Sequence, residues 1–157
     1  MMKRTWLICV LCLVAVALGL AFRPPPPISL ASRVEMSSHI FVGTAVDLTV
    51  VDGKGNVLKP EPPALTNFGS ADMTVQINEV LFPSGWKTNG PVKVRLGGAA
   101  FIVAAMRKDF LNKKLIYLTV LRDGYFQPSY PWHLTEPLDV RAQIETAIRT
   151  NKVATAQ

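Results

Sequence analysis

Cysteine is scarce in this chain, which has two among its 157 residues, Cys9 and Cys12. Both lie in an apolar stretch near the start, so their C-x-x-C spacing is typical of small apolar residues in a membrane-directed helix, not of a redox or metal pair. A bacterial lipoprotein signal needs a small residue before the cysteine, but Ile8 and Leu11 hold those positions. The chain after Cys12 therefore lacks a thiol, and it must be stabilised by its core without disulfides.

Histidine is equally scarce, and the familiar catalytic motifs are missing. His39 and His133 are the two imidazoles, and no H-E-x-x-H or C-x-x-C pattern supplies further ligands, so we expect no metal site. Ser84 stands in a P-S-G-W turn and lacks the G-x-S-x-G elbow of an esterase. The glycine pair at 97–98 has no following G-K-S/T, which excludes a phosphate-binding loop. These absences favour a protein that is not an enzyme and holds no cofactor.

Paired carboxylates are the one catalytic arrangement that the sequence leaves open. Asp47, Asp72 and Glu79 could meet across neighbouring strands, although the solvated face of a sheet carries such residues routinely. A close pair of carboxylates, or a histidine–acid pair in a cleft, would favour a small envelope hydrolase, the alternative function. An open aromatic surface without such a pair would favour binding.

The start of the chain predicts export from the cytoplasm. Two basic residues precede a charge-free apolar stretch, and small residues fit a cleavage site before Phe22. We therefore predict a signal peptide over 1–21, a stiff proline-rich spacer over 22–27 and a single domain over 28–157.

The alternative is an apolar stretch that is not cleaved. Residues 6–22 would then anchor the domain in the inner membrane, since their length is at the lower limit for a membrane span of about 17 to 25 residues. This alternative would make the protein a membrane-anchored structural domain. In both cases the domain is expected outside the cytoplasm, in the periplasm or secreted.

The positive charge of the chain is mild. Its 17 basic and 11 acidic residues give a net charge of +6, and without the basic pair at positions 3 and 4 the net charge is +4. Arg107, Lys108, Lys113 and Lys114 form a local cluster, but charges in a turn usually serve solvation. Because no exposed stacking aromatics accompany the basic residues in the predicted strands, we do not expect nucleic acid as a partner.

Alternating hydrophobicity predicts a long strand in "HIFVGTAVDLTVV", residues 39–51. One parity, expected to face the core, holds Ile40, Val42, Val46, Leu48 and Val50. At about 3.3 Å per residue the strand would be roughly 43 Å long, so we expect it to bend, with an irregularity at Gly43. A long bent first strand that serves two parts of a sheet is what a small closed barrel needs.

The remaining patterns complete a mainly β domain. We expect a short helix over 28–37, strands over 71–82 and 92–96, and a central strand over 113–121 that is apolar on both parities. Residues 52–70 form a long loop that we expect to be mobile, and residues 99–106 are either helix or strand. An amphipathic helix ends the domain, with Val140, Ile144, Ala147 and Ile148 on its apolar face.

The order of these elements resembles a known group. The runs "SLASRVEMSSHIFVGTAV", "TVQINEVLFPSG", "VKVRLGG" and "LNKKLIYLTVL" look like a widespread group of uncharacterised bacterial secreted proteins. That group is similar to the oligonucleotide/oligosaccharide-binding (OB-fold) barrel of the tissue inhibitors of metalloproteinases and netrin-type modules. The resemblance covers about residues 28–121 and implies a five-stranded Greek-key barrel flanked by helices. Metalloproteinase inhibition does not carry over, because those inhibitors use an N-terminal cysteine and the predicted mature terminus starts at Phe22.

One aromatic-rich segment, "DGYFQPSYPWHL", is the candidate site for a ligand or partner. Tyr125, Phe126, Tyr130 and Trp132 could form a platform for a sugar ring or a peptide, or an irregular cover that closes one end of the barrel, and we favour the cover. We therefore predict a non-enzymatic extracytoplasmic binding or accessory module, whose partner is a protein or glycan of the cell envelope. The partner would meet this segment or the 52–70 loop.

Overall fold

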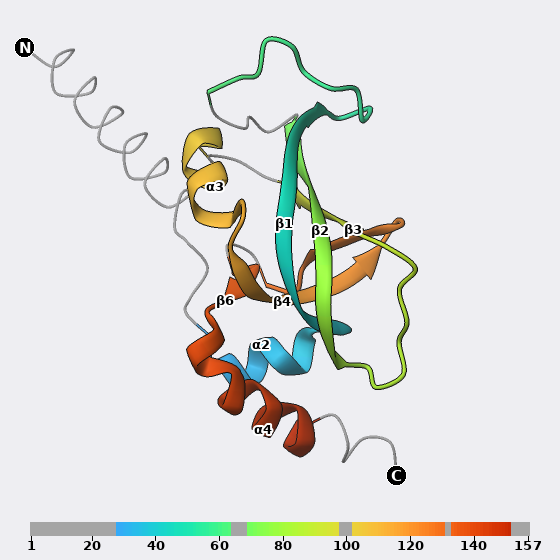
Figure 1. The fold of residues 1–157 in the computed structure, drawn as a ribbon, viewed down its shortest axis with the longest axis vertical. Coiled ribbons are helices and arrows are strands. Elements are labelled where there is room, and N and C mark those ends of the chain that lie inside the picture. The colour runs from blue at the N-terminus through green and yellow to red at the C-terminus, as the bar shows by residue number, and fades with distance from the viewer. Residues whose placement is uncertain (1–27, 64–68, 98–101, 131–132, 152–157) are drawn as a thin grey trace, which may run out of the picture.

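The structure is a computed structural model that describes residues 28–63, 69–97, 102–130 and 133–151. The predicted signal peptide and spacer lie outside these residues, as does Trp132. The elements in chain order (Figure 1) are α2 (Leu30–Met36), β1 (His39–Asp52), β2 (Gly69–Phe82), β3 (Val92–Gly97), α3 (Val103–Phe110), β4 (Lys114–Arg122), β5 (Tyr125–Pro128), β6 (Thr135–Glu136), the short 3-10 helix η1 (Leu138–Val140) and α4 (Arg141–Asn151).

Five strands pair in a closed ring, and the expected mainly β fold is confirmed. β1 pairs antiparallel with β2 and, through its first half, with β4. β2 pairs with β3, β3 meets β5 through the parallel pair Val94 and Phe126, and β5 returns to β4. The two residues of β6 add to β4. Figure 1 shows α3 beside the upper part of the long strands, and α2 and α4 together below them.

The long first strand exists as predicted, but one of its expected core residues faces solvent. Ala45 pairs with a β2 residue and Asp47 with the next one, so Val46 is an extra residue in a bulge. The bulge moves the ring-facing set from odd to even positions, and Leu48 and Val50 are buried beyond it. Val46 is 53% exposed. Its prediction as a core residue was wrong because strict alternation does not continue through a bulge.

Gly43 marks the irregularity that the sequence predicted for this strand. It is paired on both sides, with Ile77 of β2 and with Leu115 of β4, and the register of β1 against β2 shifts directly before it. A Cβ atom at this position would lie 2.6 Å from Cγ1 of Val75 and 3.1 Å from the carbonyl oxygen of Gln76. Glycine is therefore required here by the close approach of β2.

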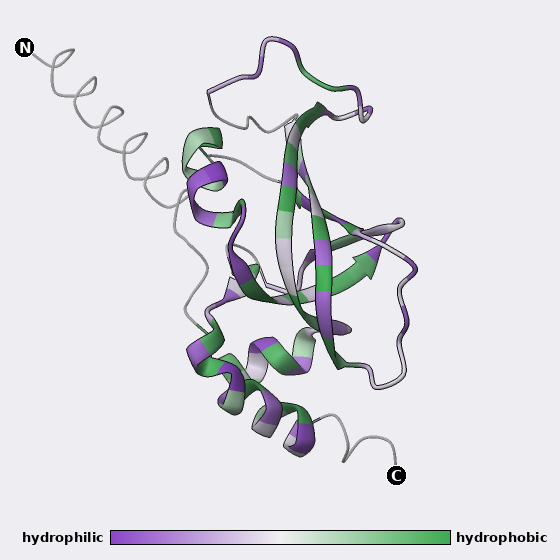
Figure 2. Ribbon diagram, in the orientation of Figure 1, coloured by the Kyte–Doolittle hydropathy of each residue, from purple (hydrophilic) through white to green (hydrophobic). Residues whose placement is uncertain are grey.

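Two apolar cores share the strands of the ring. Figure 2 shows hydrophobic and hydrophilic residues alternating along β1 and β2. One core lies inside the ring and includes Phe41, Met73, Tyr117 and Phe126. The second lies between the strands and the pair α2 and α4, where its buried members are Val34, Ile40, Val42, Ile116, Leu118 and Ile144. β1 and β4 contribute to both cores, because neighbouring residues of a strand point to opposite faces.

The two cores explain which of the other predicted elements formed. Ile116, Tyr117 and Leu118 of β4 are all fully buried, as expected for a central strand covered on both faces. Val140, Ala147 and Ile148 pack against the second core around Ile144, which confirms the amphipathic C-terminal helix. The ambiguous segment at 99–106 belongs in part to helix α3, and residues 98–101 lie outside the described ranges. In the ranges that the structure describes, no helix is long and apolar enough to cross a membrane.

The long loop after β1 is folded in its first part. Asp52 accepts hydrogen bonds from the backbone N–H groups of Lys54 and Asn56 through Oδ1, at 2.8 and 2.9 Å. The chain then turns back, and the N–H of Leu58 donates to the carbonyl of Val50 at 2.9 Å. Leu58 also packs against the core inside the ring. These contacts join the first residues of the loop to β1; the mobility of the loop stays a prediction.

Among the buried side-chain polar atoms of the described residues, the Tyr117 hydroxyl is the one inside the ring that has no hydrogen-bond partner. The Tyr117 ring is fully buried and stacks on Phe41, with centroids 5.3 Å apart and 10° between the planes. Replacing Tyr117 with phenylalanine keeps this stack and removes an unsatisfied buried group. We expect Tyr117→Phe to raise the free energy of unfolding by about 1 kcal/mol in urea denaturation at neutral pH.

The same variant should change the response to alkali. Burial raises the pKa of Tyr117 far above its usual range, so the folded protein holds the phenol proton at pH values where the unfolded chain releases it. Ionisation of Tyr117 therefore does not affect stability below about pH 10, the ordinary pKa of tyrosine, and it lowers the stability of the folded protein as the pH rises further. We expect the alkaline loss to be smaller in Tyr117→Phe; equal losses in both proteins would contradict the assignment to Tyr117.

Candidate binding site at the aromatic end of the ring

The predicted aromatic segment is divided between core and surface. Phe126 is 7% exposed and belongs to the core inside the ring, and Tyr130 is 9% exposed beside His133. These two are therefore unavailable as parts of an open platform, because their rings supply core area. Tyr125 is half-buried on β5, and Trp132 lies outside the described residues. Burial of Phe126 and Tyr130 supports the interpretation of this segment as a cover.

Phe126 instead joins a group of rings that the sequence analysis did not bring together. Trp86, from the turn between β2 and β3, packs against His39 at 4.8 Å between ring centroids, Phe126 at 5.4 Å and Phe41 at 5.8 Å. The angles between the Trp86 plane and these rings are 74°, 54° and 53°. We call the three rings around this indole, His39, Phe41 and Phe126, the aromatic end of the ring. The indole of Trp86 is thus packed between three aromatic rings whose planes are steeply inclined to its own.

His39 is the polar member of the aromatic end. Its Nδ1 lies 3.0 Å from the hydroxyl of Ser38, which also accepts the backbone N–H of Leu121 at 3.2 Å. Since that hydroxyl still has its own proton to give, we assign it as the donor to Nδ1, which places the imidazole hydrogen on Nε2. Burial lowers the pKa of His39, so the ring is neutral at physiological pH. It offers an N–H donor beside the indole.

Arg95 of β3 lies between the carboxylate of Asp72 on β2 and the aromatic ring of Tyr125 on β5. The Arg95 guanidinium lies 3.6 Å from the centroid of Tyr125. Nε and Nη2 of Arg95 donate to the two carboxylate oxygens of Asp72, both at 2.7 Å. This ion pair raises the pKa of Arg95. Asp72 and Tyr125 are thus held in a fixed position on the outside of the sheet.

The candidate catalytic groups are not brought together. Asp72 is bound to Arg95, and Glu79 is bound by Arg141, which holds the pKa of the Glu79 carboxyl below its usual range. Asp47 accepts the hydroxyl of Thr49 at 3.2 Å. Within the described part of the chain, no carboxylate bonds to His39 and no three His, Cys, Asp or Glu side chains form a possible metal site. Among the described residues, the three candidate carboxylates are thus engaged with Arg95, Arg141 and Thr49 and not with one another.

Of the four residues of the predicted basic cluster, one forms an ion pair and three are exposed to solvent. Arg107 of α3 forms an ion pair with Glu61 of the long loop, and this pairing raises the pKa of Arg107. Lys108, Lys113 and Lys114 are exposed around the turn between α3 and β4. The side chains thus form a solvated turn with one structural contact to the loop, as charges in such turns usually do.

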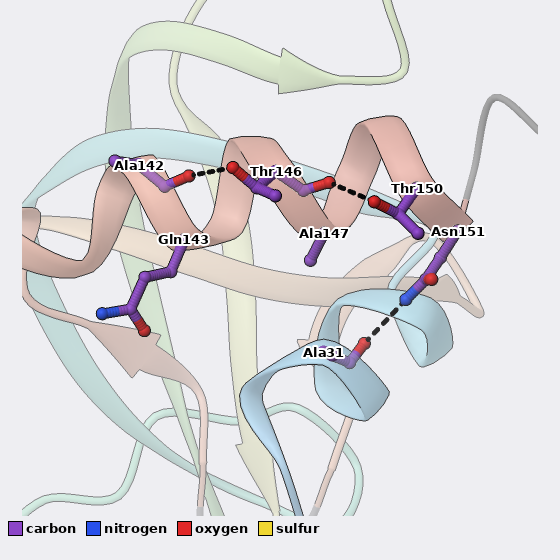
Figure 3. A pocket seen from close by; sticks show the side chains of 7 residues that line it. All are labelled: Ala31, Ala142, Gln143, Thr146, Ala147, Thr150 and Asn151. Atoms are coloured by element: carbon purple, nitrogen blue, oxygen red, sulfur yellow. Dashed lines mark hydrogen bonds between the residues drawn. The ribbon is translucent and has the colours of Figure 1, made fainter.

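A concave surface lies between α2 and α4 (Figure 3). This groove has a volume of about 500 Å³ and is lined by Ala31, Ala142, Gln143, Thr146, Ala147, Thr150 and Asn151. The hydroxyls of Thr146 and Thr150 donate to carbonyls one turn earlier in α4, at 2.8 and 3.1 Å. The Asn151 amide donates to the Ala31 carbonyl at 3.5 Å. Because its hydroxyls are satisfied by the helix itself, the groove is an uncharged, mainly apolar surface.

Comparison of the chain with protein-family models, with curated proteins and with solved structures found no match. In the sequence, His39 is a candidate for a metal ligand or for a histidine–acid pair, and Trp86 belongs to the P-S-G-W turn. A large aromatic residue in a glycine-containing surface turn was the signal available, since such a residue usually needs a buried contact.

Proposed function

We propose that the protein is an extracytoplasmic, non-enzymatic binding or accessory module built on an OB-fold barrel. The strand order β1-β2-β3-β5-β4, closed by the pairing of β1 with β4, supports a five-stranded Greek-key barrel. The position of helix α3 between β3 and β4 also supports this barrel. The start of the chain supports export.

The observation that carries a binding role is the surroundings of His39. A serine–histidine pair works as a catalytic nucleophile when a third group orients the imidazole. His39 bonds to Ser38 and faces the rings of Trp86 and Phe126, and no carboxylate in the described ranges bonds to it. These surroundings support binding through the rings better than catalysis. Rings around one neutral donor are a recognition surface for a protein or glycan of the cell envelope.

The test is to recover the full chain with a C-terminal tag from the envelope and from the culture fluid. Intact mass and N-terminal sequencing are expected to show cleavage before Phe22, and cross-linking should capture a reproducible partner. His39→Gln should reduce this capture strongly. Lys108→Ala is the control, since Lys108 is exposed on α3, outside both segments proposed to meet the partner. An intact Met1 in the membrane without a partner, or capture that ignores His39→Gln, would overturn the proposal.

A further inference from the structure

The turn between β2 and β3 is attached to the rest of the protein in an unusual way. Residues 83–91, which we call the strap, contain two hydrogen bonds, from Trp86 N to the Pro83 carbonyl at 3.2 Å and from Thr88 Oγ1 to the Gly90 carbonyl at 3.0 Å. Both bonds join residues of the strap to each other. Among the described residues, no hydrogen bond or ion pair links residues 84–91 to another element. The strap contacts the aromatic end through the indole of Trp86.

The backbone of the strap has room to move. Gly85 has φ at +88°, a conformation that glycine adopts readily. A Cβ atom at Gly85 or Gly90 would meet no described heavy atom within 4 Å. Moving the strap away from the strands therefore breaks the contacts of the half-buried Trp86 indole. It breaks no hydrogen bond between the strap and the strands among the described residues. Proteins with two conformations commonly hold the minor one at about 0.1 to 10%, and we place the open strap in that range.

Departure of Trp86 would leave a slot of defined chemistry. Its walls are the rings of His39, Phe41 and Phe126, and its one polar group is the His39 Nε2–H, which has no partner in the described part of the chain. Walls inclined by 53° to 74° match an inserted aromatic ring, which prefers edge-to-face contacts. A sugar ring instead stacks on one open aromatic face, and this slot has none.

On the basis of the proposed function, we infer that the aromatic end binds an aromatic side chain of a partner polypeptide, and that Trp86 is an internal occupant that the partner displaces. The partner's aromatic ring takes the position of the indole, and the adjoining peptide carbonyl accepts the hydrogen bond from Nε2 of His39. The strap then acts as an autoinhibitory cover. It keeps the slot closed until a competing ring arrives.

The test measures binding of N-acetyl-tryptophanamide to the full chain by calorimetry. Trp86→Ser removes the internal occupant of the slot. The affinity of this variant for the probe should be at least about ten-fold higher than that of the wild type, because the wild type opens the slot only in a minor population. Lys87→Ser changes the exposed neighbour of Trp86 and should bind as the wild type does. N-acetyl-leucinamide and a disaccharide should bind weakly to all three proteins.

Equal affinity of Trp86→Ser and wild type for the tryptophan probe would overturn the inference, as would equally tight binding of the leucine or sugar probe. If Trp86→Ser does not fold, the indole N–H resonance of Trp86 in the NMR spectrum of the wild type decides. Saturating tryptophan probe should shift this resonance, because the indole leaves the rings of His39, Phe41 and Phe126, while the amide resonances of β4 stay in place. An unchanged indole resonance would overturn the inference. Absence of an envelope partner would instead defeat the proposed function, and a partner captured equally by Trp86→Ser and wild type would defeat this inference alone.

Discussion

Gly43→Val is expected to lower the free energy of unfolding by about 3 kcal/mol, because overpacking at a closely paired site forces both strands apart. The new side chain would start 2.6 Å from Cγ1 of Val75, a fully buried residue, and 3.1 Å from the backbone oxygen of Gln76. A backbone atom cannot move aside as a side-chain end can. Urea denaturation monitored by circular dichroism measures the loss.

The matched control is Gly97→Val at the end of β3. A Cβ atom there meets no described heavy atom within 4 Å, and Gly97 is exposed. The expected change is within about 0.5 kcal/mol, the usual range for surface positions. Similar losses in both variants would show that the strand propensity of valine or the flexibility of glycine decides the result, and would contradict the close approach of β2 at Gly43.

Loss of the ion pair between Arg33 and Glu136 should have an effect of similar size. Arg33 of α2 and Glu136 of β6 are only 12% and 14% exposed, and the guanidinium donates to the carboxylate. Glu136→Met would leave the Arg33 charge nearly buried without a counter-charge. We expect this variant to lose about 3 kcal/mol of unfolding free energy in the same urea assay, since an uncompensated buried charge is strongly unfavourable.

A double variant separates the charge effect from lost packing. Arg33→Met combined with Glu136→Met removes both charges and should recover most of the stability, because apolar residues of similar volume often replace a buried ion pair without loss. Glu79→Met breaks the pair with Arg141, whose side chains are 44% and 40% exposed, and should cost much less. A double variant as unstable as Glu136→Met would contradict the electrostatic explanation.

The regular elements were predictable because their signal is local. The two-residue period of β2 and β3, the doubly apolar run of β4 and the helical spacing around Ile144 each lie within one short segment. Val46 shows where this reasoning fails. Its place on the surface results from a bulge against β2, and a bulge depends on the partner strand as well as on the strand that carries it.

The candidate site was not predictable in the same way. His39, Trp86 and Phe126 come from β1, from a turn and from β5, and they meet because the ring closes. The sequence drew attention to Phe126 as one of a cluster of neighbouring aromatics, but burial removed it and Tyr130 from the surface. Trp86 is not part of a cluster of aromatic residues in the sequence, so no pattern marked it as a member of a site.

The sequence by itself determined which segments alternate, which strand is buried on both faces, and that the chain after Cys12 has no disulfide to stabilise it. Each of these is a property of composition or of a short window. Only the tertiary structure decided that β3 meets β5 in parallel, that Val46 points outward and that one indole is held between three rings. Contacts between distant segments are chosen by packing over the whole core, so no local pattern in the chain specifies them.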